Sequence, residues 1–146
     1  MVIIRFFDIF FALLGLLILS PVLVFIIISI RITSKGNVFF PQVRVGQYGK
    51  DFKVLKFRTM CKNAERKGFL TVGGNDNRIT KVGYYLRRYK LDELPQLINV
   101  IKGEMSIVGP RPEVRKYVDL YTDEQKKVLD VLPGITDYAS DRKSVV

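Results

Sequence analysis

The sequence contains no histidine and only one cysteine, Cys61, among its 146 residues. The absence of histidine excludes Ser-His and Cys-His nucleophile systems and any metal site with imidazole ligands. Acid–base work must therefore fall to Asp, Glu, Lys or Tyr side chains. A single cysteine cannot form an intramolecular disulfide, which fits a reducing compartment. Cys61 also lacks the neighbours expected of a nucleophile, and we interpret it as a structural residue.

Acidic residues are scarce compared with basic ones. The chain has 14 Asp and Glu against 24 Lys and Arg, which is a formal net charge of +10. Its length suits one domain with a modest core. A surface this basic attracts anions such as nucleic acid, acidic lipid headgroups or phosphorylated substrates. No recognised nucleic-acid-binding motif accompanies the charge, so we do not expect a nucleic-acid partner.

Charged residues are also missing from residues 9–30, a long apolar run near the N-terminus. An α-helix of that length extends roughly 33 Å, about the thickness of a bilayer core. No small-residue cleavage site follows the run, which argues against a secretory signal. We therefore predict that residues 1–35 form a membrane helix and that residues 36–146 form a water-facing domain.

Ser20 and Pro21 lie in the middle of the apolar run. The proline cannot donate to the carbonyl of Leu17, so we expect a kink there, with the Ser20 hydroxyl helping to satisfy the local backbone. A kink at mid-depth would let both ends of the helix emerge on one face. Basic residues on both flanks, Arg5 and Arg31, agree with this topology. An ordinary kinked spanning helix is the alternative.

Residues 36–146 are predicted to fold as an α+β domain that is mostly helical. The expected elements are a hairpin of strands 38–45 and 52–57 around a turn at 46–51, a polar helix at 62–67, a loop at 73–77, a basic amphipathic helix at 79–89, a short apolar segment at 105–108, and helices at 114–121 and after a capping box at 122–125. Helices that carry aromatic and basic residues can lie on a membrane interface, although packing onto a small core explains them equally well.

Asp92 and Glu93 are adjacent carboxylates at the start of a helical pattern. The apolar positions of this pattern are Leu91, Leu94, Leu97, Ile98 and Ile101. Pro95 fits the first turn of such a helix, because amides there have no intrahelical partner. Arg87 precedes the pair and Arg111 follows it, which suggests phosphate chemistry with a metal ion or a covalent step. The alternative is a capping arrangement with solvated charges.

Several motifs occur in a characteristic order. They are Ser20-Pro21, Val38-Phe39-Phe40, Arg44-Val45-Gly46, Lys56-Phe57-Arg58-Thr59-Met60, Asp76-Asn77-Arg78-Ile79-Thr80-Lys81-Val82-Gly83, the stretch 91–100, Lys102-Gly103-Glu104-Met105-Ser106, Val108-Gly109-Pro110-Arg111-Pro112 and Pro133-Gly134-Ile135-Thr136. From about residue 5 to about residue 140, the chain resembles the bacterial sugar transferase family, the monotopic polyprenyl-phosphate phosphoglycosyl transferases. One such motif is a weak signal, but the ordered set is highly specific.

The resemblance implies an enzyme that transfers a sugar-1-phosphate from a UDP-sugar to undecaprenyl phosphate and releases UMP. This reaction begins assembly of a membrane-linked glycan, such as a capsule, O-antigen, exopolysaccharide or glycoprotein. The expected location is the bacterial inner membrane, with residues 36–146 as the catalytic domain on its cytoplasmic face. UDP-sugar, undecaprenyl phosphate and membrane lipid are the expected partners, and a homodimer is left open. No motif encodes which sugar is used.

The resemblance also implies roles for individual residues. Asp92 would be the nucleophile that forms a covalent phosphosugar intermediate, with a Mg²⁺ ion that it helps to bind, and Glu93 would activate the lipid phosphate or position the metal. The cations expected to stabilise the transferring phosphoryl group are Arg87 and Arg111, followed by Lys56 and Arg58. The turn that contains Pro112 would hold the nucleotide diphosphate, and Ser20 with Pro21 would make the re-entrant kink.

Two departures from the family pattern affect these expectations. Lys90 occupies a position where the family commonly has a small hydroxyl residue, so the expected N-cap is missing. The family usually continues beyond residues 133–136 with sequence that helps to close the nucleotide site, whereas residues 141–146 do not look family-like. We therefore interpret the C-terminus as a candidate truncation. The alternative function is a catalytically silent basic module on the membrane surface, a truncated paralogue.

Overall fold

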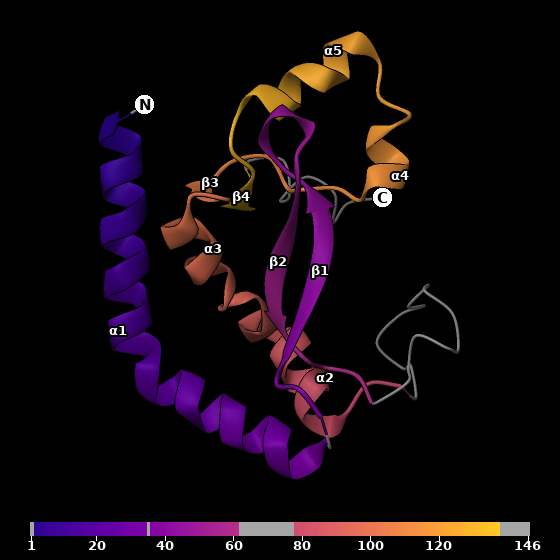
Figure 1. Cartoon of the computed structure of the whole chain (residues 1–146). Coiled ribbons are helices and arrows are strands. Elements are labelled where there is room, and N and C mark those ends of the chain that lie inside the picture. Colours follow the sequence, from indigo (N-terminus) through magenta and orange to yellow (C-terminus); the bar gives the residue numbers. More distant parts are fainter. Residues whose placement is uncertain (1, 35, 62–77, 138–146) are drawn as a thin grey trace.

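The computed structural model describes residues 2–34, 36–61 and 78–137, as a long bent helix beside an α+β unit (Figure 1). The predicted helix at 62–67 and loop at 73–77 lie outside the described residues. Within the described part, one helix, α1, is long and apolar enough to cross a membrane. The predicted fold class, a mostly helical α+β fold with a small hairpin and an apolar N-terminal helix, is confirmed.

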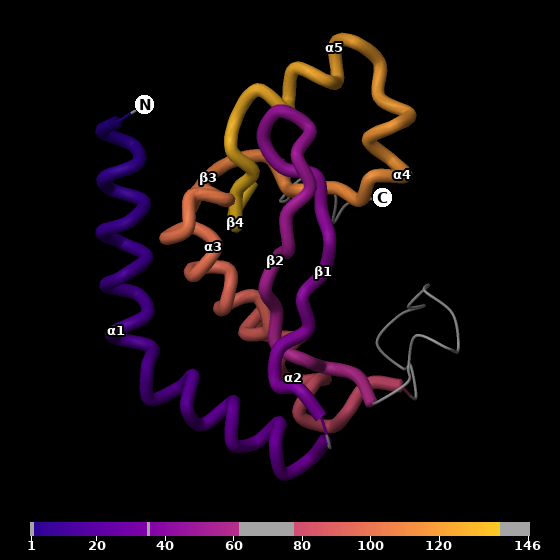
Figure 2. The backbone as a smooth tube through the Cα atoms, in the orientation of Figure 1, coloured from indigo at the N-terminus to yellow at the C-terminus, as the bar shows by residue number. Residues whose placement is uncertain are grey.

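Helix α1 spans Val2–Thr33 and extends beyond the predicted apolar run at both ends. The tube trace shows that it bends near its middle without being interrupted (Figure 2). Pro21 lies inside the helix, and a proline there leaves the carbonyl four residues earlier without its usual donor. The Oγ of Ser20 donates a hydrogen bond of 2.8 Å to that carbonyl, on Leu17. The serine therefore supplies a donor to the group that the proline frees.

The hairpin consists of β1 (Phe39–Val45) and β2 (Asp51–Phe57), which pair antiparallel along their whole length. Its tip is the 3-10 turn η1 (Gln47–Gly49), in which Tyr48 and Gly49 have φ values of 56° and 71°. The strands are rich in β-branched and aromatic residues, which favour a pleated surface. The predicted strand bounds agree with the structure to within one residue at each end.

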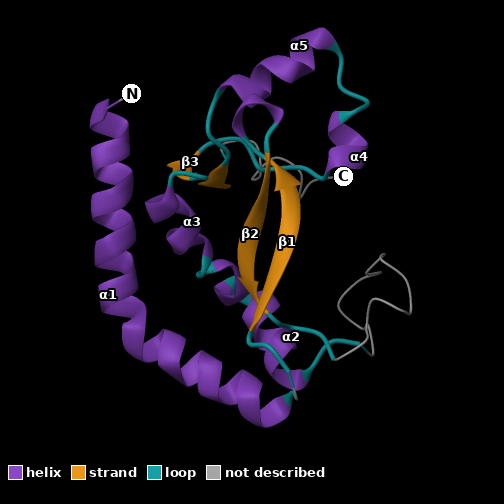
Figure 3. Cartoon of the chain, in the orientation of Figure 1, coloured by secondary structure: helices purple, strands orange, loops and turns teal. Residues whose placement is uncertain are grey.

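Short helical segments follow the hairpin (Figure 3). They are α2 (Lys81–Arg88), η3 (Leu91–Glu93), α3 (Gln96–Lys102), α4 (Arg115–Val118), α5 (Asp123–Lys126) and η4 (Lys127–Asp130). The predicted capping box at the start of α5 is present, because Thr122 and Gln125 exchange both of its hydrogen bonds. The helix predicted at 114–121 is shorter than expected, since α4 has only one turn.

Two further strands, β3 (Ser106–Val108) and β4 (Gly134–Thr136), form a small parallel pair. A side chain on Gly134 would collide with the backbone of Gly109, so glycine is required where the two strands approach. The apolar segment at 105–108 was expected from the sequence. Its parallel pairing with residues 134–136 was not, because it joins segments far apart in the chain.

Each half of α1 packs against a different part of the α+β unit. The N-terminal half joins the buried cluster of Ala12, Val54, Val100 and Met105. The C-terminal half joins the buried cluster of Ile26, Ile30, Val38, Phe57 and Leu86. The first cluster lies against α3 and β2, and the second lies against α2 and the open end of the hairpin. The bend in α1 therefore lets one helix contact both ends of the unit that carries the acidic pair.

Candidate active site

Asp92 and Glu93 belong to η3, which we call the acidic turn. We expected them in the first turn of the following α-helix, but they lie in a separate 3-10 turn before it, and Pro95 is the N-cap of α3. In a continuous helix the amide of residue 95 would donate to the carbonyl of Leu91, and proline has no such amide. The amide of Leu94 takes that carbonyl instead, at 3.3 Å. The proline thus favours a 3-10 turn in place of an α-helical turn at the residues that carry the two carboxylates.

Glu93 is held by two cations from different elements. The Nζ of Lys56, on β2, lies 2.9 Å from Glu93 Oε1, and an Nη of Arg111, after β3, lies 2.7 Å from the same oxygen. The Glu93 side chain is only 13% exposed. Burial alone would raise its pKa, but the two cations outweigh burial and lower it below the ordinary value. Glu93 is therefore an ionised carboxylate at neutral pH.

Asp92 has the opposite environment, although it is the adjacent residue. Among the described residues no ion pair or side-chain hydrogen bond reaches its carboxylate. Burial raises the pKa of Asp92 above its ordinary value, and nearby Glu93 acts in the same direction, whereas Lys56, a backbone hydrogen bond at Asp92 itself and Arg87 oppose the rise. A desolvated carboxylate without an ion-pair partner is a more available nucleophile or metal ligand than one locked in ion pairs.

Arg87 reaches the site from the last turn of α2. Its Nε donates to Thr59 Oγ1 at 2.8 Å. The Thr59 carbonyl in turn accepts from the amide of Thr80 at 3.0 Å. A side chain on Gly83 would collide with the Thr59 backbone, so α2 lies directly against this segment. Arg87 is thus positioned by its contact with a buried threonine, and its charge lies near Asp92.

A pocket of about 130 Å³ opens next to the acidic turn. Its polar wall is made by Arg44, Lys56, Gln96, Arg111, Pro112 and Glu113. Three of these residues are cationic and one is anionic, so the pocket favours an anion. Its volume is below the roughly 300–1,000 Å³ typical of sites that enclose a whole ligand. These walls are therefore suited to part of a substrate, such as a phosphoryl group.

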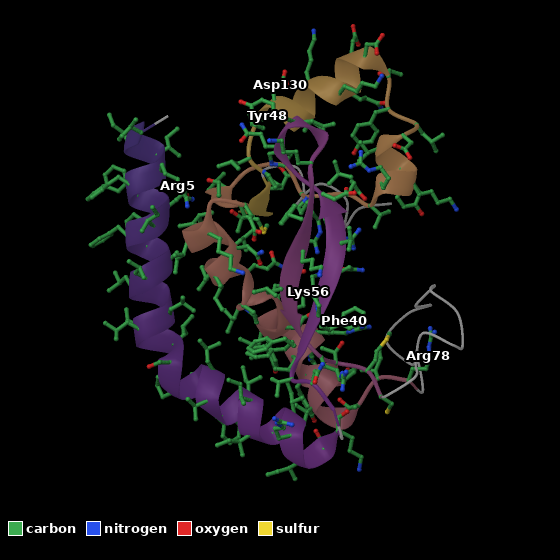
Figure 4. All side chains as sticks on the ribbon, in the orientation of Figure 1. Arg5, Phe40, Tyr48, Lys56, Arg78 and Asp130 are labelled. Atoms are coloured by element: carbon green, nitrogen blue, oxygen red, sulfur yellow. The ribbon has the colours of Figure 1, made fainter. Side chains whose placement is uncertain are left out.

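The structure brings most of the predicted site residues together. Lys56 and Arg111 contact Glu93, Arg87 lies near Asp92, and Pro112 lines the pocket. Figure 4 labels Lys56 on the hairpin, and its Nζ pairs with Glu93 of the acidic turn.

Arg58 is the predicted site residue that lies elsewhere. Its guanidinium packs over Gly36, just after α1, and its Nη1 is buried without a hydrogen-bond partner among the described residues. It does not line the pocket. Its predicted role in substrate binding stays a prediction, and these contacts do not support it.

The carboxylates of the site suit a magnesium ion that is bound partly by the protein and partly by the substrate. Among the described residues, no three Asp, Glu, Cys or His side chains are close enough to form a metal site by themselves. Mg²⁺ commonly uses one or two carboxylates, with substrate phosphates and water as the remaining ligands. Asp92 has a carboxylate free for such a role, whereas Glu93 is occupied by Lys56 and Arg111. The residues present therefore fit an ion bound together with substrate.

Comparison with known families identifies the chain. A profile of the family described as bacterial sugar transferase matches residues 1–144. The chain belongs to the bacterial sugar transferase family. The resemblance inferred from the ordered motifs is thereby confirmed.

Several relatives are similar to this chain in sequence. It is 43% identical over 139 residues to the uncharacterized sugar transferase EpsL of Bacillus subtilis. It is 41% identical over 135 residues to UDP-N-acetylgalactosamine-undecaprenyl-phosphate N-acetylgalactosaminephosphotransferase of Aeromonas hydrophila, and 46% identical over 139 residues to UDP-glucose:undecaprenyl-phosphate glucose-1-phosphate transferase of Escherichia coli. These matches cover 95%, 90% and 90% of this chain, but 68%, 32% and 29% of the respective relatives.

Sequence reasoning gave no role to three polar residues that line the pocket, Arg44, Gln96 and Glu113. Arg44 belongs to one of the ordered motifs, and Gln96 directly follows Pro95, so both were noticed without a role. Helical spacing was the available signal for Gln96, because residues three and four positions apart share a face, which places it one turn after the carboxylates. Nothing local in the sequence indicated that Arg44 lines the same pocket as Lys56 and Arg111.

Proposed function

We propose that this sugar transferase moves a sugar-1-phosphate from a UDP-sugar to undecaprenyl phosphate and releases UMP, as the first membrane step of glycan assembly. The names of two relatives, which use UDP-N-acetylgalactosamine and UDP-glucose with undecaprenyl phosphate, support this reaction class. The observation that carries the proposal is the Asp92 carboxylate, which has no ion-pair partner among the described residues and lies next to Glu93, whose cations Lys56 and Arg111 line the pocket. The identity of the sugar is left to the experiment below.

The proposed reaction consists of two displacements at one phosphorus. In the first, an Asp92 carboxylate oxygen bonds to the phosphorus that carries the sugar, the bond from that phosphorus to UMP breaks, and UMP leaves with the bridging oxygen. In the second, an oxygen of undecaprenyl phosphate bonds to the same phosphorus and the bond to Asp92 breaks. The products are UMP and a polyprenyl diphosphate sugar, and Asp92 is regenerated. A covalent intermediate of this kind divides one difficult step into two.

The surrounding charges suit these steps. Lys56, Arg87 and Arg111 would stabilise the charge that develops on the transferring phosphoryl group. Glu93 keeps Lys56 and Arg111 in place through the ion pairs described above. We propose that it also activates the lipid phosphate or positions the metal. Mg²⁺, held by Asp92 and the substrate phosphates, would neutralise phosphate charge when bound.

We further propose that α1 enters the bilayer and returns to the same face. Its two halves contact the same α+β unit, through Arg5 and Asp8 at one end and Ile26 and Ile30 at the other. A straight spanning helix would carry one end roughly 30 Å away from that unit, across the hydrocarbon core. The bend near Pro21 removes that separation. The active site would then lie at the cytoplasmic face of the inner membrane.

UMP release tests the reaction. The detergent-solubilised chain is incubated with undecaprenyl phosphate, Mg²⁺ and a panel of UDP-sugars, and UMP is measured. We expect release with at least one sugar and a loss of roughly 10³-fold or more in Asp92→Asn, since the nucleophile is removed. Full turnover by Asp92→Asn would refute the covalent mechanism. No release with any sugar, together with salt-sensitive binding to anionic vesicles, would favour the silent membrane-surface module.

Cysteine labelling tests the topology. In a Cys61→Ser background, single cysteines replace Val2 or Asn37, which are both exposed and lie at opposite ends of α1. A membrane-impermeant thiol reagent should label both positions only from the cytoplasmic side. Labelling of either cysteine from outside would refute the re-entrant topology and support a helix that spans the membrane.

A further inference from the structure

Gln96 is a buried polar residue without a partner in the described part of the chain. It is the first residue of α3, only 4% of it is exposed, and it lines the pocket beside the acidic turn. No hydrogen bond joins its side-chain amide to any described residue. Its amide atoms are not among the fully buried polar atoms that lack a partner in the described residues, so they are accessible from the pocket, where a ligand can reach them.

Asn99, one turn further along α3, shows what a structural amide looks like in this fold. It is fully buried, its Oδ1 accepts from the amide of Leu55 at 3.0 Å, and its Nδ2 donates to the carbonyl of Lys53 at 2.8 Å and to Glu104 at 2.6 Å. These bonds tie α3 to β2. Gln96 has the same functional group on the same helix but makes none of these contacts, so its amide is available to a ligand.

The charges around Gln96 indicate the ligand class. Arg44, Lys56 and Arg111 line the pocket with it, and Glu113 is the anionic residue among the described lining residues. Lys56 and Arg111 also pair with Glu93, whereas Arg44 has no ion-pair partner in the described part of the chain. Burial lowers the pKa of Arg44, an effect that Glu113 opposes, so this guanidinium is poorly solvated. A bound anion would restore the solvation that Arg44 has lost. Phosphate oxygens match guanidinium and amide donors in both charge and hydrogen-bond geometry.

We propose that the Gln96 amide binds a phosphoryl oxygen of the UMP half of the donor, and that Gln96 is a substrate-binding residue of this pocket. The proposal rests on the proposed function, because it assigns part of the same site. Gln96 follows Asp92 by four residues and Glu93 by three, so it lies one helical turn away from them. A phosphate held there would be next to the phosphorus that Asp92 attacks, on the leaving-group side. A phosphate ester of the lipid acceptor has the same chemistry, and the experiment separates the two sources.

Two substitutions of matched size test the role of Gln96. Gln96→Met removes the amide, and Gln96→Glu places a negative charge where a phosphate is expected. The control is Gln125→Glu, which adds the same charge on the exposed helix α5 and keeps the capping box, since glutamate serves there as well as glutamine. Thermal unfolding of each purified full-length variant in detergent shows whether the fold is retained.

The readouts are the KM for the UDP-sugar, the KM for undecaprenyl phosphate and the affinity for UMP. For Gln96→Glu we expect a rise of about 10–100-fold in the UDP-sugar KM and a matching loss of UMP affinity, since like charges meet in a buried site. For Gln96→Met we expect the UDP-sugar KM to rise about 3–10-fold, which corresponds to the loss of one neutral hydrogen bond. The acceptor KM should stay within about twofold, and Gln125→Glu should match the unsubstituted protein.

Unchanged UDP-sugar KM and UMP affinity in both Gln96 variants would overturn the proposal. A change confined to the acceptor KM would overturn the assignment to the nucleotide and move the site to the lipid phosphate. A lower melting temperature with unchanged KM values would make Gln96 purely structural, which also overturns it. UMP binding that is lost in Gln96→Glu, with no UMP release by the unsubstituted chain, would support this site while refuting the proposed reaction.

Discussion

Carboxylates in contrasting surroundings lie near the two ends of α3, although none of them belongs to that helix. The acidic turn lies before its first residue. Beyond its last residue, Asp8 of α1 accepts a hydrogen bond from Ser106 Oγ at 2.8 Å and another from the amide of Ile107 at 3.0 Å. Arg5, which projects from α1 toward this junction (Figure 4), donates to the carbonyls of Ile101 and Met105 at 3.0 and 3.4 Å.

The difference between these regions separates a structural carboxylate from a reactive one. Asp8 is buried, its bonds come from neutral donors, and it lines neither of the pockets found near the acidic turn. Its carboxylate occupies the free edge of β3, where a further strand would otherwise supply acceptors. Asp92 and Glu93 instead face cations and differ in the direction of their pKa shifts, and the two cations that hold Glu93 line a pocket. Burial alone therefore does not indicate function, but unfinished pairing beside a pocket does.

The largest expected contrast is in turnover. Glu93→Gln should reduce UMP release by about 10²–10⁴-fold, the usual range for a group that assists proton transfer or positions a reacting centre. The carboxamide cannot hold Lys56 and Arg111 as an anion does. Asp8→Asn keeps the shape and the acceptor oxygen, so turnover per folded molecule should stay within about threefold. Both variants are assayed under the conditions used for Asp92→Asn.

Equal losses of turnover in Glu93→Gln and Asp8→Asn would break the comparison, because the acidic turn would then be no more functional than the α1 junction. A fold check by thermal unfolding is needed for each variant, so that turnover is expressed per folded molecule.

The next contrast is in stability. Asp8→Ala leaves the Ser106 hydroxyl and the Ile107 amide without their acceptor, and we expect a loss of about 1–3 kcal/mol. That loss should lower the melting temperature by several degrees. Asp92→Asn removes a desolvated charge that has no fixed partner, so at neutral pH it should be at least as stable as the unsubstituted protein. Thermal unfolding in one detergent checks both, and a destabilised Asp92→Asn with an unaffected Asp8→Ala would reverse the assignment.

Local patterns predicted much of this molecule, because the features concerned depend on residues close in sequence. The hairpin follows from two β-rich runs around a turn, and the capping box follows from the spacing of Thr122 and Gln125. The donor from Ser20 to the Leu17 carbonyl follows from the position of Pro21. The cations around the acidic pair were expected from the family resemblance.

What could not be predicted depends on contacts between distant segments. Asp8 and Ser106 are 98 positions apart, and no local pattern indicates that they meet. The same holds for the parallel pairing of β3 with β4. Within the site, the sequence did not indicate that Glu93 would take both Lys56 and Arg111 and leave Asp92 unpaired. That division of partners depends on how β2 and the segment after β3 approach the acidic turn in three dimensions.

The smallest expected effect distinguishes the two adjacent carboxylates by pH. Glu93 has a lowered pKa, so it contributes stability above its ordinary value of 4.5, and that contribution is lost as the pH falls through its folded value. Asp92 has a raised pKa, so its charged form costs stability at neutral pH, and the cost disappears below its ordinary value of 3.8. Glu93→Gln should therefore be less stable than the unsubstituted protein, and this difference should be largest near pH 7 and disappear in acid. Asp92→Asn should be more stable than the unsubstituted protein, and this difference too should be largest near pH 7 and disappear in acid. Melting temperatures of the three proteins from about pH 3.5 to 7 measure both differences. Differences of the same sign for both variants would mean that the two carboxylates share one environment, and the separation of an ion-paired Glu93 from an available Asp92 would fail.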